Sequence, residues 1–221
     1  MGRQAENLRD ALLDIYHLLY DSYGRQYWWP ADAPFEVIIG AILTQSTAWT
    51  NVEKAIANLK AAASLDPQSI HRIPIEELAR LIRPSGYYNA KALKVKAFVE
   101  RLCTKYDGDL DELFQLDTDS LRHELLSIHG VGDETADSII LYAARRPVFV
   151  IDAYTRRILN RLGLAPAKDS YSAYQALFTD NLPADERLFN EYHALLVRHG
   201  KQVCKKVPLC NGCCLRSMCS K

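Results

Sequence analysis

Five of the six cysteines in this 221-residue chain lie within its last eighteen residues. One Cys-x2-Cys pair with a single cysteine on each side is typical of an iron–sulfur cluster, whereas structural zinc sites usually use two separated pairs. Disulfides are the other alternative, but adjacent Cys213 and Cys214 suit them poorly, and no secretory leader is recognisable. The run therefore predicts a 4Fe-4S cluster held by four thiolates, those of Cys204, Cys210, Cys213 and Cys219.

The composition allows a folded core and argues against a membrane protein. Hydrophobic residues make up 48% of the chain, which suits one large domain or two small ones. The longest apolar run, residues 37–43, is far too short to cross a bilayer. The N-terminus is charged and amphipathic, unlike a signal peptide. We therefore expect a soluble, cytoplasmic monomer that makes no membrane contact.

The charge distribution leaves room for a nucleic-acid partner, although the net charge is zero. Residues 198–221 hold six lysines and arginines and no acid, and residues 145–161 hold five arginines and one acid. Residues 80–105 hold seven basic residues and one acid. Basic faces on a neutral protein can follow a phosphate backbone. A solvated helix face would also explain any one of these stretches.

Helical periodicity runs through the whole sequence. Leu8, Leu12, Ile15 and Leu19 recur at intervals of three and four, and similar patterns follow in residues 52–59, 121–128 and 158–162. Prolines and glycines divide the chain into about ten helices of ordinary length. The only strand-like stretch, residues 148–151, is too short and isolated to found a sheet. The predicted fold class is all-α.

A second motif, residues 126–137, reads Leu-Ser-Ile-His-Gly-Val-Gly-Asp-Glu-Thr-Ala-Asp. An apolar helix is expected to end at Ile128, and a new helix to open at Asp133 or Glu134. Two glycines permit the sharp turn between them and the close approach of a phosphate, towards which the N–H groups of the following helix point. A Gly-x-Gly turn alone is weak support. The motif predicts a hairpin that grips the DNA backbone through Gly130, Val131, Gly132 and Thr135.

Eighteen residues after Glu134, Asp152 follows an apolar segment and immediately precedes a helix. Aspartate is a favoured N-cap, and its position alone favours that role. The hairpin and the cysteine run shift the balance towards catalysis.

The hairpin, the segment Val-Ile-Asp-Ala-Tyr-Thr-Arg-Arg and the cysteine run, in this order, resemble the endonuclease III superfamily of helix–hairpin–helix DNA glycosylases. The resemblance covers almost the whole chain. It implies a six-helix barrel with the hairpin at residues 34–147, a cluster domain from residues 1–33 and 148–221, and a DNA-binding cleft between them. The family commonly has six residues between its first two cysteines, whereas this chain has five. The choice between Cys213 and Cys214 therefore stays open, and Cys213 preserves the later spacings.

The same resemblance assigns roles to two carboxylates. It implies that Asp152 is the catalytic residue. Bifunctional members carry a lysine two residues after the second hairpin glycine, as a Schiff-base nucleophile. This chain has Glu134 at that position, and a carboxylate cannot form an imine. We therefore expect a monofunctional glycosylase without strong lyase activity.

Aromatic motifs bear on the substrate. Tyr-Trp-Trp-Pro at residues 27–30, Thr-Gln-Ser-Thr-Ala-Trp at 44–49 and Arg-Pro-Ser-Gly-Tyr-Tyr-Asn at 83–89 resemble the 3-methyladenine glycosylase branch of the superfamily. The resemblance implies that Gln45 fills the gap left by an extruded nucleotide. It also implies a base pocket lined by Trp28, Trp29, Pro30 and Trp49.

Such a pocket suits alkylated purines, because aromatic faces attract their positive charge once the base is flipped out of the duplex. The expected partner is double-stranded DNA containing a damaged base, and the expected location is the cytoplasmic nucleoid. An adenine-mismatch glycosylase would need an acid where residues 40–43 read Gly-Ala-Ile-Leu. Two alternatives stay open: excision of uracil or mismatched thymine, and a non-catalytic DNA-binding or redox-sensing cluster protein.

Overall fold

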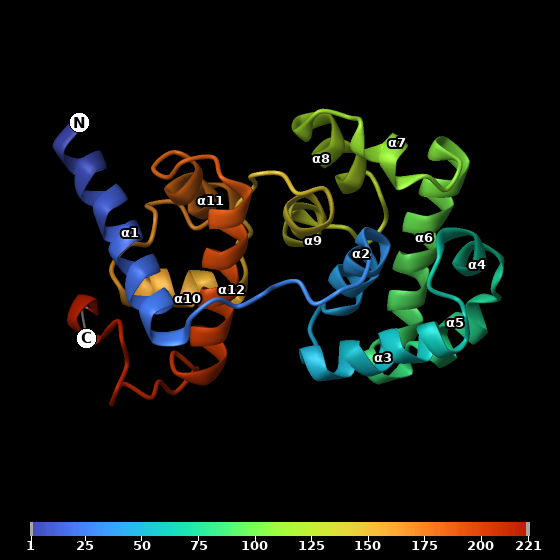
Figure 1. Ribbon diagram of the computed structural model, residues 1–221, viewed down its shortest axis with the longest axis horizontal. Helices are drawn as coiled ribbons and strands as arrows, with labels where there is room; N and C mark the ends of the chain where they lie inside the picture. The colour runs from blue at the N-terminus through green and yellow to red at the C-terminus, as the bar shows by residue number, and fades with distance from the viewer. Residues whose placement is uncertain (1, 220–221) are drawn as a thin grey trace. The chain divides into compact units, whose positions relative to one another are not determined.

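The computed structural model describes residues 2–219, and every regular element in this range is helical. Residues 148–151 run as largely buried, extended chain with no partner strand in the described range. The all-α prediction is therefore confirmed (Figure 1). The elements are α1 (Gly2–Tyr23), α2 (Pro34–Leu43), α3 (Trp49–Ala61), α4 (Pro67–Arg72), α5 (Ile75–Leu81), η1 (Arg83–Ser85), α6 (Tyr88–Tyr106), α7 (Leu110–Phe114), α8 (Thr118–Leu126), α9 (Asp133–Ser138), η2 (Ile139–Ala143), α10 (Ala153–Arg161), α11 (Tyr171–Thr179), α12 (Glu186–Gln202) and η3 (Arg216–Met218).

The chain divides into two compact units. One, the terminal unit, comprises Met1–Trp28 together with Pro147–Lys221, and the other, the central unit, comprises Trp29–Arg146. The terminal unit contains α1 and α10 to α12, and the central unit contains α2 to α9. The boundaries expected from the sequence, at residues 33/34 and 147/148, fall close to these divisions. Each unit is described by itself below.

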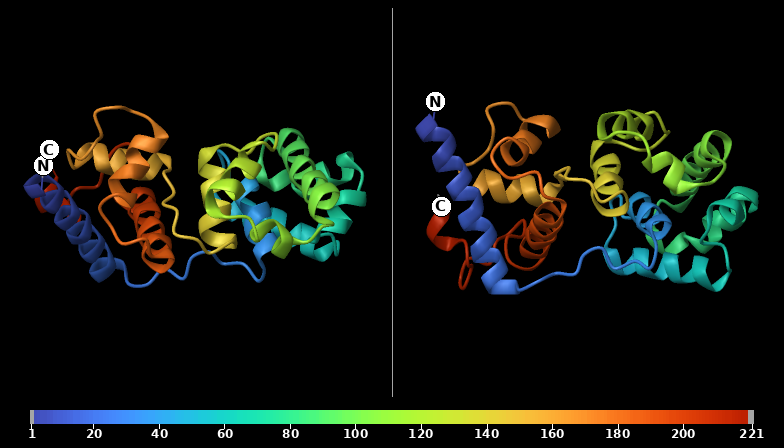
Figure 2. Two further views of the ribbon diagram at one scale, coloured as in Figure 1. Left: turned by 90° about the horizontal axis from the view of Figure 1, so that it is seen from above. Right: turned by 45° about the horizontal axis from the view of Figure 1, so that its top comes forward.

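The central unit is built around α2. Pro34 stands in its first turn, where a missing N–H costs nothing, and the nine residues from Phe35 to Leu43 are all buried. This helix packs against α3, α6, α9 and the π-helical segment η2, while α6 also contacts α4 and α5 (Figure 2). Because α2 ends at Leu43, the loop that carries Gln45 leaves directly from the core.

An aromatic cluster forms the core of the terminal unit. The rings of Phe149 and Phe178 stack with centroids 3.6 Å apart, and Phe189 and Tyr192 meet Phe149 edge-on. The Tyr192 hydroxyl donates to the Leu12 carbonyl of α1 at 2.8 Å. This cluster fixes the extended segment that leads from Phe149 to Asp152, so the core of the unit positions the candidate catalytic carboxylate.

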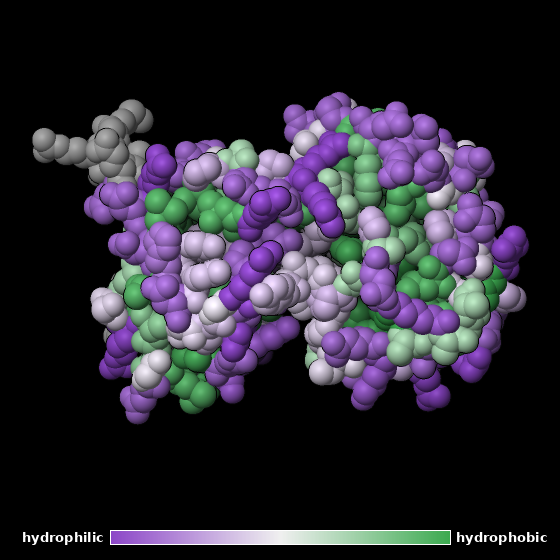
Figure 3. All heavy atoms as spheres, in the orientation of Figure 1, coloured by the Kyte–Doolittle hydropathy of each residue, from purple (hydrophilic) through white to green (hydrophobic). Residues whose placement is uncertain are grey.

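On the face shown in Figure 3, hydrophilic side chains surround patches of hydrophobic ones in each unit. Within residues 2–219, none of the helices is both long enough and apolar enough to cross a membrane.

Candidate functional site

The hairpin forms between α8 and α9, much as the sequence predicts. α8 ends at Leu126, two residues before the expected end at Ile128, and α9 begins at Asp133. The Val131 N–H donates to the Ile128 carbonyl at 3.1 Å and closes the turn. Gly130 has a φ of +83°, in the left-handed region that favours glycine. The side chain of Val131 is buried, so only its backbone can face a ligand.

Gly132 is the N-cap residue of α9, and a methyl group placed on it would meet no other atom within 4 Å. The N-terminal end of α9 is therefore sterically open at Gly132. An open helix N-terminus presents backbone N–H groups that suit a phosphate. This geometry is compatible with the predicted backbone contact.

Gln45 is bound to the hairpin. Its amide nitrogen donates to the Gly130 carbonyl at 3.1 Å and to the Thr135 hydroxyl at 3.0 Å, and the ammonium group of Lys94 donates to its amide oxygen. Since Lys94 also packs directly against Gly130, α6 supports both the loop and the turn. The two segments proposed to contact DNA, the Gln45 loop and the hairpin, form one connected structure.

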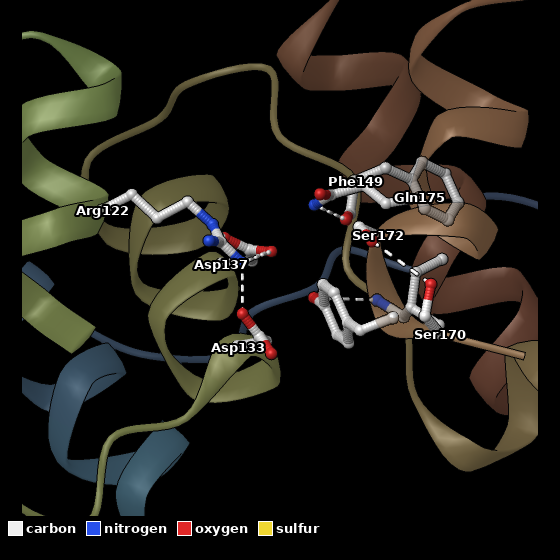
Figure 4. A network of polar contacts seen from close by, with 9 residues as sticks. Arg122, Asp133, Asp137, Phe149, Ser170, Ser172 and Gln175 are labelled. Atoms are coloured by element: carbon white, nitrogen blue, oxygen red, sulfur yellow. Dashed lines mark hydrogen bonds and ion pairs between the residues drawn. The ribbon is translucent and has the colours of Figure 1, made fainter.

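Arg122 of α8 neutralises the acidic start of α9 (Figure 4). Its guanidinium group lies 2.6 Å from the Asp133 carboxylate and 2.7 Å from the Asp137 carboxylate, which is completely buried. The hydrogen bond from Arg122 to Asp137 is the main cause that raises the pKa of Arg122. Glu134, between them, is exposed. The charges of Asp133 and Asp137 are therefore compensated by Arg122 within the protein itself.

A buried lysine joins two loops on the other side of Gln45. Lys91 of α6 is 2% exposed, and its ammonium group donates to the Leu43 carbonyl at 2.8 Å and to the Ser85 carbonyl at 2.6 Å. Burial, with a smaller contribution from the charge of Lys94, lowers the pKa of Lys91 to about 8. This lysine holds the end of α2 against the tyrosine-containing turn that precedes α6.

Asp152 is the N-cap of α10, as its position alone suggested, but the cap occupies only one of its oxygens. Its Oδ1 accepts a hydrogen bond from the Thr155 N–H at 2.7 Å, and the residue is 8% exposed. Its Oδ2 accepts no hydrogen bond from residues 7–219, whose side chains the structure describes. Burial lowers the pKa of the nearby His193, while the negative charge of Asp152 acts in the opposite direction. A cap and a second, available carboxylate oxygen coexist in one side chain.

The segment before Asp152 is held by α11. The Gln175 amide donates to the Phe149 carbonyl at 2.8 Å, as Figure 4 shows, and the Ile151 N–H donates to the Tyr171 hydroxyl at 3.2 Å. These bonds take the place of the hydrogen bonds that an extended chain would make to a neighbouring strand in a sheet. They fix the direction in which Asp152 leaves the core.

Three of the four predicted pocket residues line one cavity of about 200 Å³ in the central unit. The rings of Trp29 and Trp49 lie 5.0 Å apart at 89°, and Trp29 also rests against Gly40 and Tyr142. Trp28, the fourth, belongs to the terminal unit and is not part of this lining. The complete lining is Trp29, Pro30, Glu36, Trp49, Glu53, Ile56, Ala57 and Lys60.

The four predicted cluster ligands line a second cavity, of about 280 Å³, in the terminal unit, and Cys214 does not. Burial, together with the nearby Cys214 and Cys213 sulfurs, raises the pKa of Tyr23 to about 12, which places Cys214 beside α1. Among the described residues, no three His, Cys, Asp or Glu side chains are close enough to hold a single metal ion. Thiols that surround a cavity in this way fit a group larger than one ion, such as a cluster with one thiolate per iron. The lining includes Cys204, Cys210, Cys213 and Cys219.

Two arginines of α10 hold the start of the cysteine loop. Arg157 donates to the Cys204 carbonyl at 2.8 Å and to the Gly200 carbonyl at 3.0 Å. Arg161 lies 3.1 Å from the Cys204 sulfur and donates to the carbonyls of Lys205 and Lys206. The helix that Asp152 caps is therefore also the helix to which the cysteine loop is attached.

Sequence reasoning missed several residues that build these sites. Lys91 and Lys94 stand three apart on α6, a spacing that indicates one helix face, and could have been paired. Arg122 gave no such signal, because its role depends on partners that only the folded chain brings near. Glu53 follows Trp49 by four residues on α3, a spacing that could have indicated their contact. Glu36 and Lys60, which pair at 2.9 Å at the edge of the aromatic cavity, were likewise not identified.

Comparison with known sequences is consistent with this geometry. The model of the HhH-GPD superfamily of base excision DNA repair proteins matches residues 39–184. A putative DNA repair glycosylase of Methanocaldococcus jannaschii is 46% identical over 216 residues, 97% of this chain and 98% of that protein. Endonuclease III of Thermotoga maritima is 33% identical over 187 residues, 84% of this chain and 82% of that protein.

Solved structures show the same fold. The 3-methyladenine DNA glycosylase of H. pylori bound to 1,N6-ethenoadenine has a TM-score of 0.74 at 28% identity, covering 88% of this chain and 97% of that one. A non-covalent endonuclease III–DNA complex has a TM-score of 0.80 at 24% identity, covering 98% and 95%. The chain therefore belongs to the HhH-GPD superfamily of base excision DNA repair proteins, and it is a DNA glycosylase of that family.

Proposed function

We propose that this glycosylase removes alkylated purines from duplex DNA by hydrolysis alone, without cleaving the strand. The observation that carries the proposal is the cavity of about 200 Å³ walled by Trp29, Pro30 and Trp49. Its volume is below the ~300–1,000 Å³ of sites for drug-sized ligands, which suits a single flipped base. Aromatic walls favour a base that carries positive charge, as purines alkylated at N3 or N7 do.

Asp152 supplies the charge needed for the chemical step. As the bond between C1′ and the purine nitrogen breaks, its electron pair leaves with the base and the positive charge moves to the sugar. The second carboxylate oxygen of Asp152, not used for capping, stabilises that charge and orients a water molecule, which adds to C1′ and loses a proton. An alkylated purine is already a good leaving group, so no strong general acid is needed.

Gln45 and the hairpin hold the DNA rather than act on the base. The N–H groups around Gly132 bind a backbone phosphate, and Gln45 occupies the space of the extruded nucleotide. Because Gln45 is hydrogen-bonded to Gly130 and Thr135, phosphate binding at the hairpin and filling of the gap act together. Exposed Lys205, Lys206 and Arg216 add phosphate contacts from the cysteine loop.

A 4Fe-4S cluster would be held by Cys204, Cys210, Cys213 and Cys219, around the cavity they line. When bound there it supplies four iron–thiolate bonds that tie down the loop. Arg157 and Arg161 hold the loop to α10 from the protein side. Purified protein is expected to be yellow-brown, with broad absorption near ~400 nm; a colourless protein with stoichiometric zinc would contradict this.

Glu134 limits the reaction to hydrolysis. It stands where lyases of the superfamily carry a lysine, and a carboxylate cannot form an imine with the sugar. Borohydride is therefore expected to trap no covalent complex with DNA. Efficient trapping would show that another amine is the nucleophile, and Lys201 would be the first to test.

The decisive experiment is excision from a panel of duplexes that each carry one lesion, followed by alkali to cleave abasic sites. The panel includes 7-methylguanine, 3-methyladenine, hypoxanthine, 1,N6-ethenoadenine, uracil and thymine opposite guanine. Breaks that appear only after alkali, with the methylated purines processed fastest, support the proposal. Preferential excision of uracil or thymine would show that the substrate is a pyrimidine rather than an alkylated purine. Strand breaks without alkali would show that the enzyme cleaves the strand itself.

A further inference from the structure

We propose that Glu53 makes the aromatic cavity selective for bases that carry a positive charge. The proposal rests on the proposed function and names the group that would set its substrate preference. Glu53 is a positioning residue: it acts on a base through the ring of Trp49. Neither the sequence motifs nor the resemblance pointed to it.

Glu53 fixes the Trp49 ring by a hydrogen bond. Trp49 opens α3, Glu53 follows one turn later on the same face, and the indole N–H donates to the Glu53 carboxylate at 2.9 Å. A hydrogen bond to a charged acceptor is about twice as strong as a neutral one. It also draws the indole proton towards the carboxylate, which leaves the ring richer in electrons. An electron-rich indole face attracts a cation more strongly.

The charges around the cavity leave Glu53 uncompensated. The lining contains two carboxylates, Glu36 and Glu53, and one cation, Lys60. Lys60 lies 2.9 Å from Glu36 and 2.6 Å from Asp32, whereas Glu53 has no ion pair with the described side chains of residues 7–219. The cavity therefore combines two indole rings with an unpaired negative charge, a combination that favours a cationic base over a neutral one of the same shape.

A purely structural role explains Glu53 less well. The first turn of α3 contains no acidic residue, and Glu53 stands in the second turn, where interaction with the helix dipole is weak. Its side chain is exposed and makes no contact with the core that would require a carboxylate. A negative charge near bound DNA is unfavourable unless a positive group offsets it, and the flipped alkylated base is such a group.

The base loses its positive charge during the reaction, and this loss predicts which kinetic constant should change when the charge of Glu53 is removed. The base is cationic when it is bound and becomes neutral as the glycosidic bond breaks. Glu53 therefore stabilises the bound substrate more than the transition state. Loss of its charge should weaken substrate binding while leaving the maximal rate constant unchanged or higher.

The test uses single-turnover excision as a function of enzyme concentration with the iron-loaded 221-residue protein. Glu53→Gln keeps an oxygen that can accept the indole N–H and removes only the charge. We expect the half-saturating concentration for 7-methylguanine and 3-methyladenine duplexes to rise roughly three- to tenfold. The maximal rate constant should not fall, and hypoxanthine and 1,N6-ethenoadenine should change by less than about twofold. Glu76→Gln, an equal change of charge at an exposed residue of α5, is the matched control.

A second set of variants separates an effect transmitted through the indole N–H of Trp49 from an effect on folding. Trp49→Phe lacks the indole N–H, so adding Glu53→Gln to it should change selectivity less than it does in the wild type. Equal effects on cationic and neutral lesions, or none, would overturn the role of Glu53 while leaving the glycosylase intact. A wild-type enzyme that excises no alkylated purine would instead overturn the proposed function.

Discussion

In the central unit, the side chains of Gln45, Lys91 and Arg122 find their hydrogen-bond partners within the unit itself. The terminal unit differs. Asp152 has one carboxylate oxygen that accepts no hydrogen bond from the described side chains and backbone of residues 7–219, and four cysteine sulfurs line a cavity. Polar groups that are satisfied internally rigidify a scaffold, whereas groups with remaining binding capacity are those available to a reactant or cofactor. This difference supports our proposal that the central unit holds DNA and base, while the terminal unit supplies the reacting carboxylate and the cluster ligands.

The largest effect is expected for Asp152→Asn. Asparagine can still cap α10, so binding of damaged DNA should persist, but single-turnover excision should fall by at least about 10³-fold because a transition-state interaction is lost. Asp66→Asn is the matched control, since Asp66 caps α4 through a similar bond to Ser69. Excision by Asp152→Asn at the wild-type rate would reduce Asp152 to a helix cap.

The second test distinguishes the cysteines. Cys213→Ser should lose iron and the absorption near ~400 nm, because Cys213 lines the cavity with the other three thiols. Cys214→Ser and Cys103→Ser should keep both, since neither residue lines it. Iron content per chain is the measurement. Iron loss from Cys214→Ser with retention in Cys213→Ser would reverse the assignment of the third ligand.

The third prediction concerns the buried ion pair between α8 and α9 in the central unit. Arg122→Met removes the cation that pairs with the fully buried Asp137 carboxylate, which should lower the free energy of unfolding by roughly 3–5 kcal/mol. Arg80→Met removes an exposed pair with Glu77 and should cost no more than about 1 kcal/mol. Urea unfolding of both variants gives the comparison. Equal losses would show that the hairpin does not depend on its internal ion pair.

The smallest effect concerns Lys91 and pH. Its pKa of about 8 in the folded protein lies below the ordinary value of 10.5. Between these values the unfolded chain binds the proton that the folded chain has lost, so the free energy of unfolding should rise with pH. Lys91→Met removes this contribution. The difference in Tm, wild type minus variant, should be constant below pH 8 and increase from pH 8 towards pH 10; a flat difference would place the Lys91 pKa near its ordinary value.

Local features of the fold could be predicted from the sequence because they depend on near neighbours. The periodicity of Leu12, Ile15 and Leu19 follows from 3.6 residues per turn, and all three side chains are completely buried. The turn at Gly130 requires a φ that glycine adopts freely. Asp152 stands where a helix needs a cap. In each case the determining interactions span a few residues.

The candidate site shows where such reasoning stops. The sequence predicts one pocket for Trp28, Trp29, Pro30 and Trp49. The cavity of the central unit is also lined by Glu36 and Glu53, which the motifs did not indicate, while Trp28 belongs to the terminal unit. Gln45 was predicted as a contact to DNA, yet its bonds to the hairpin span 85 and 90 residues. The pairing of Arg122 with Asp133 and Asp137 depends on how α8 packs against α9.

The sequence by itself therefore determined the all-α class, the hairpin, the cap at Asp152 and the set of thiols, because backbone preferences and short spacings encode them. Only the tertiary structure decided which carboxylates stay uncompensated, which tryptophans share a cavity and which cysteine turns away towards Tyr23. Those outcomes depend on distances between side chains far apart in the chain. Such distances are fixed by close packing of the whole core rather than by any local pattern.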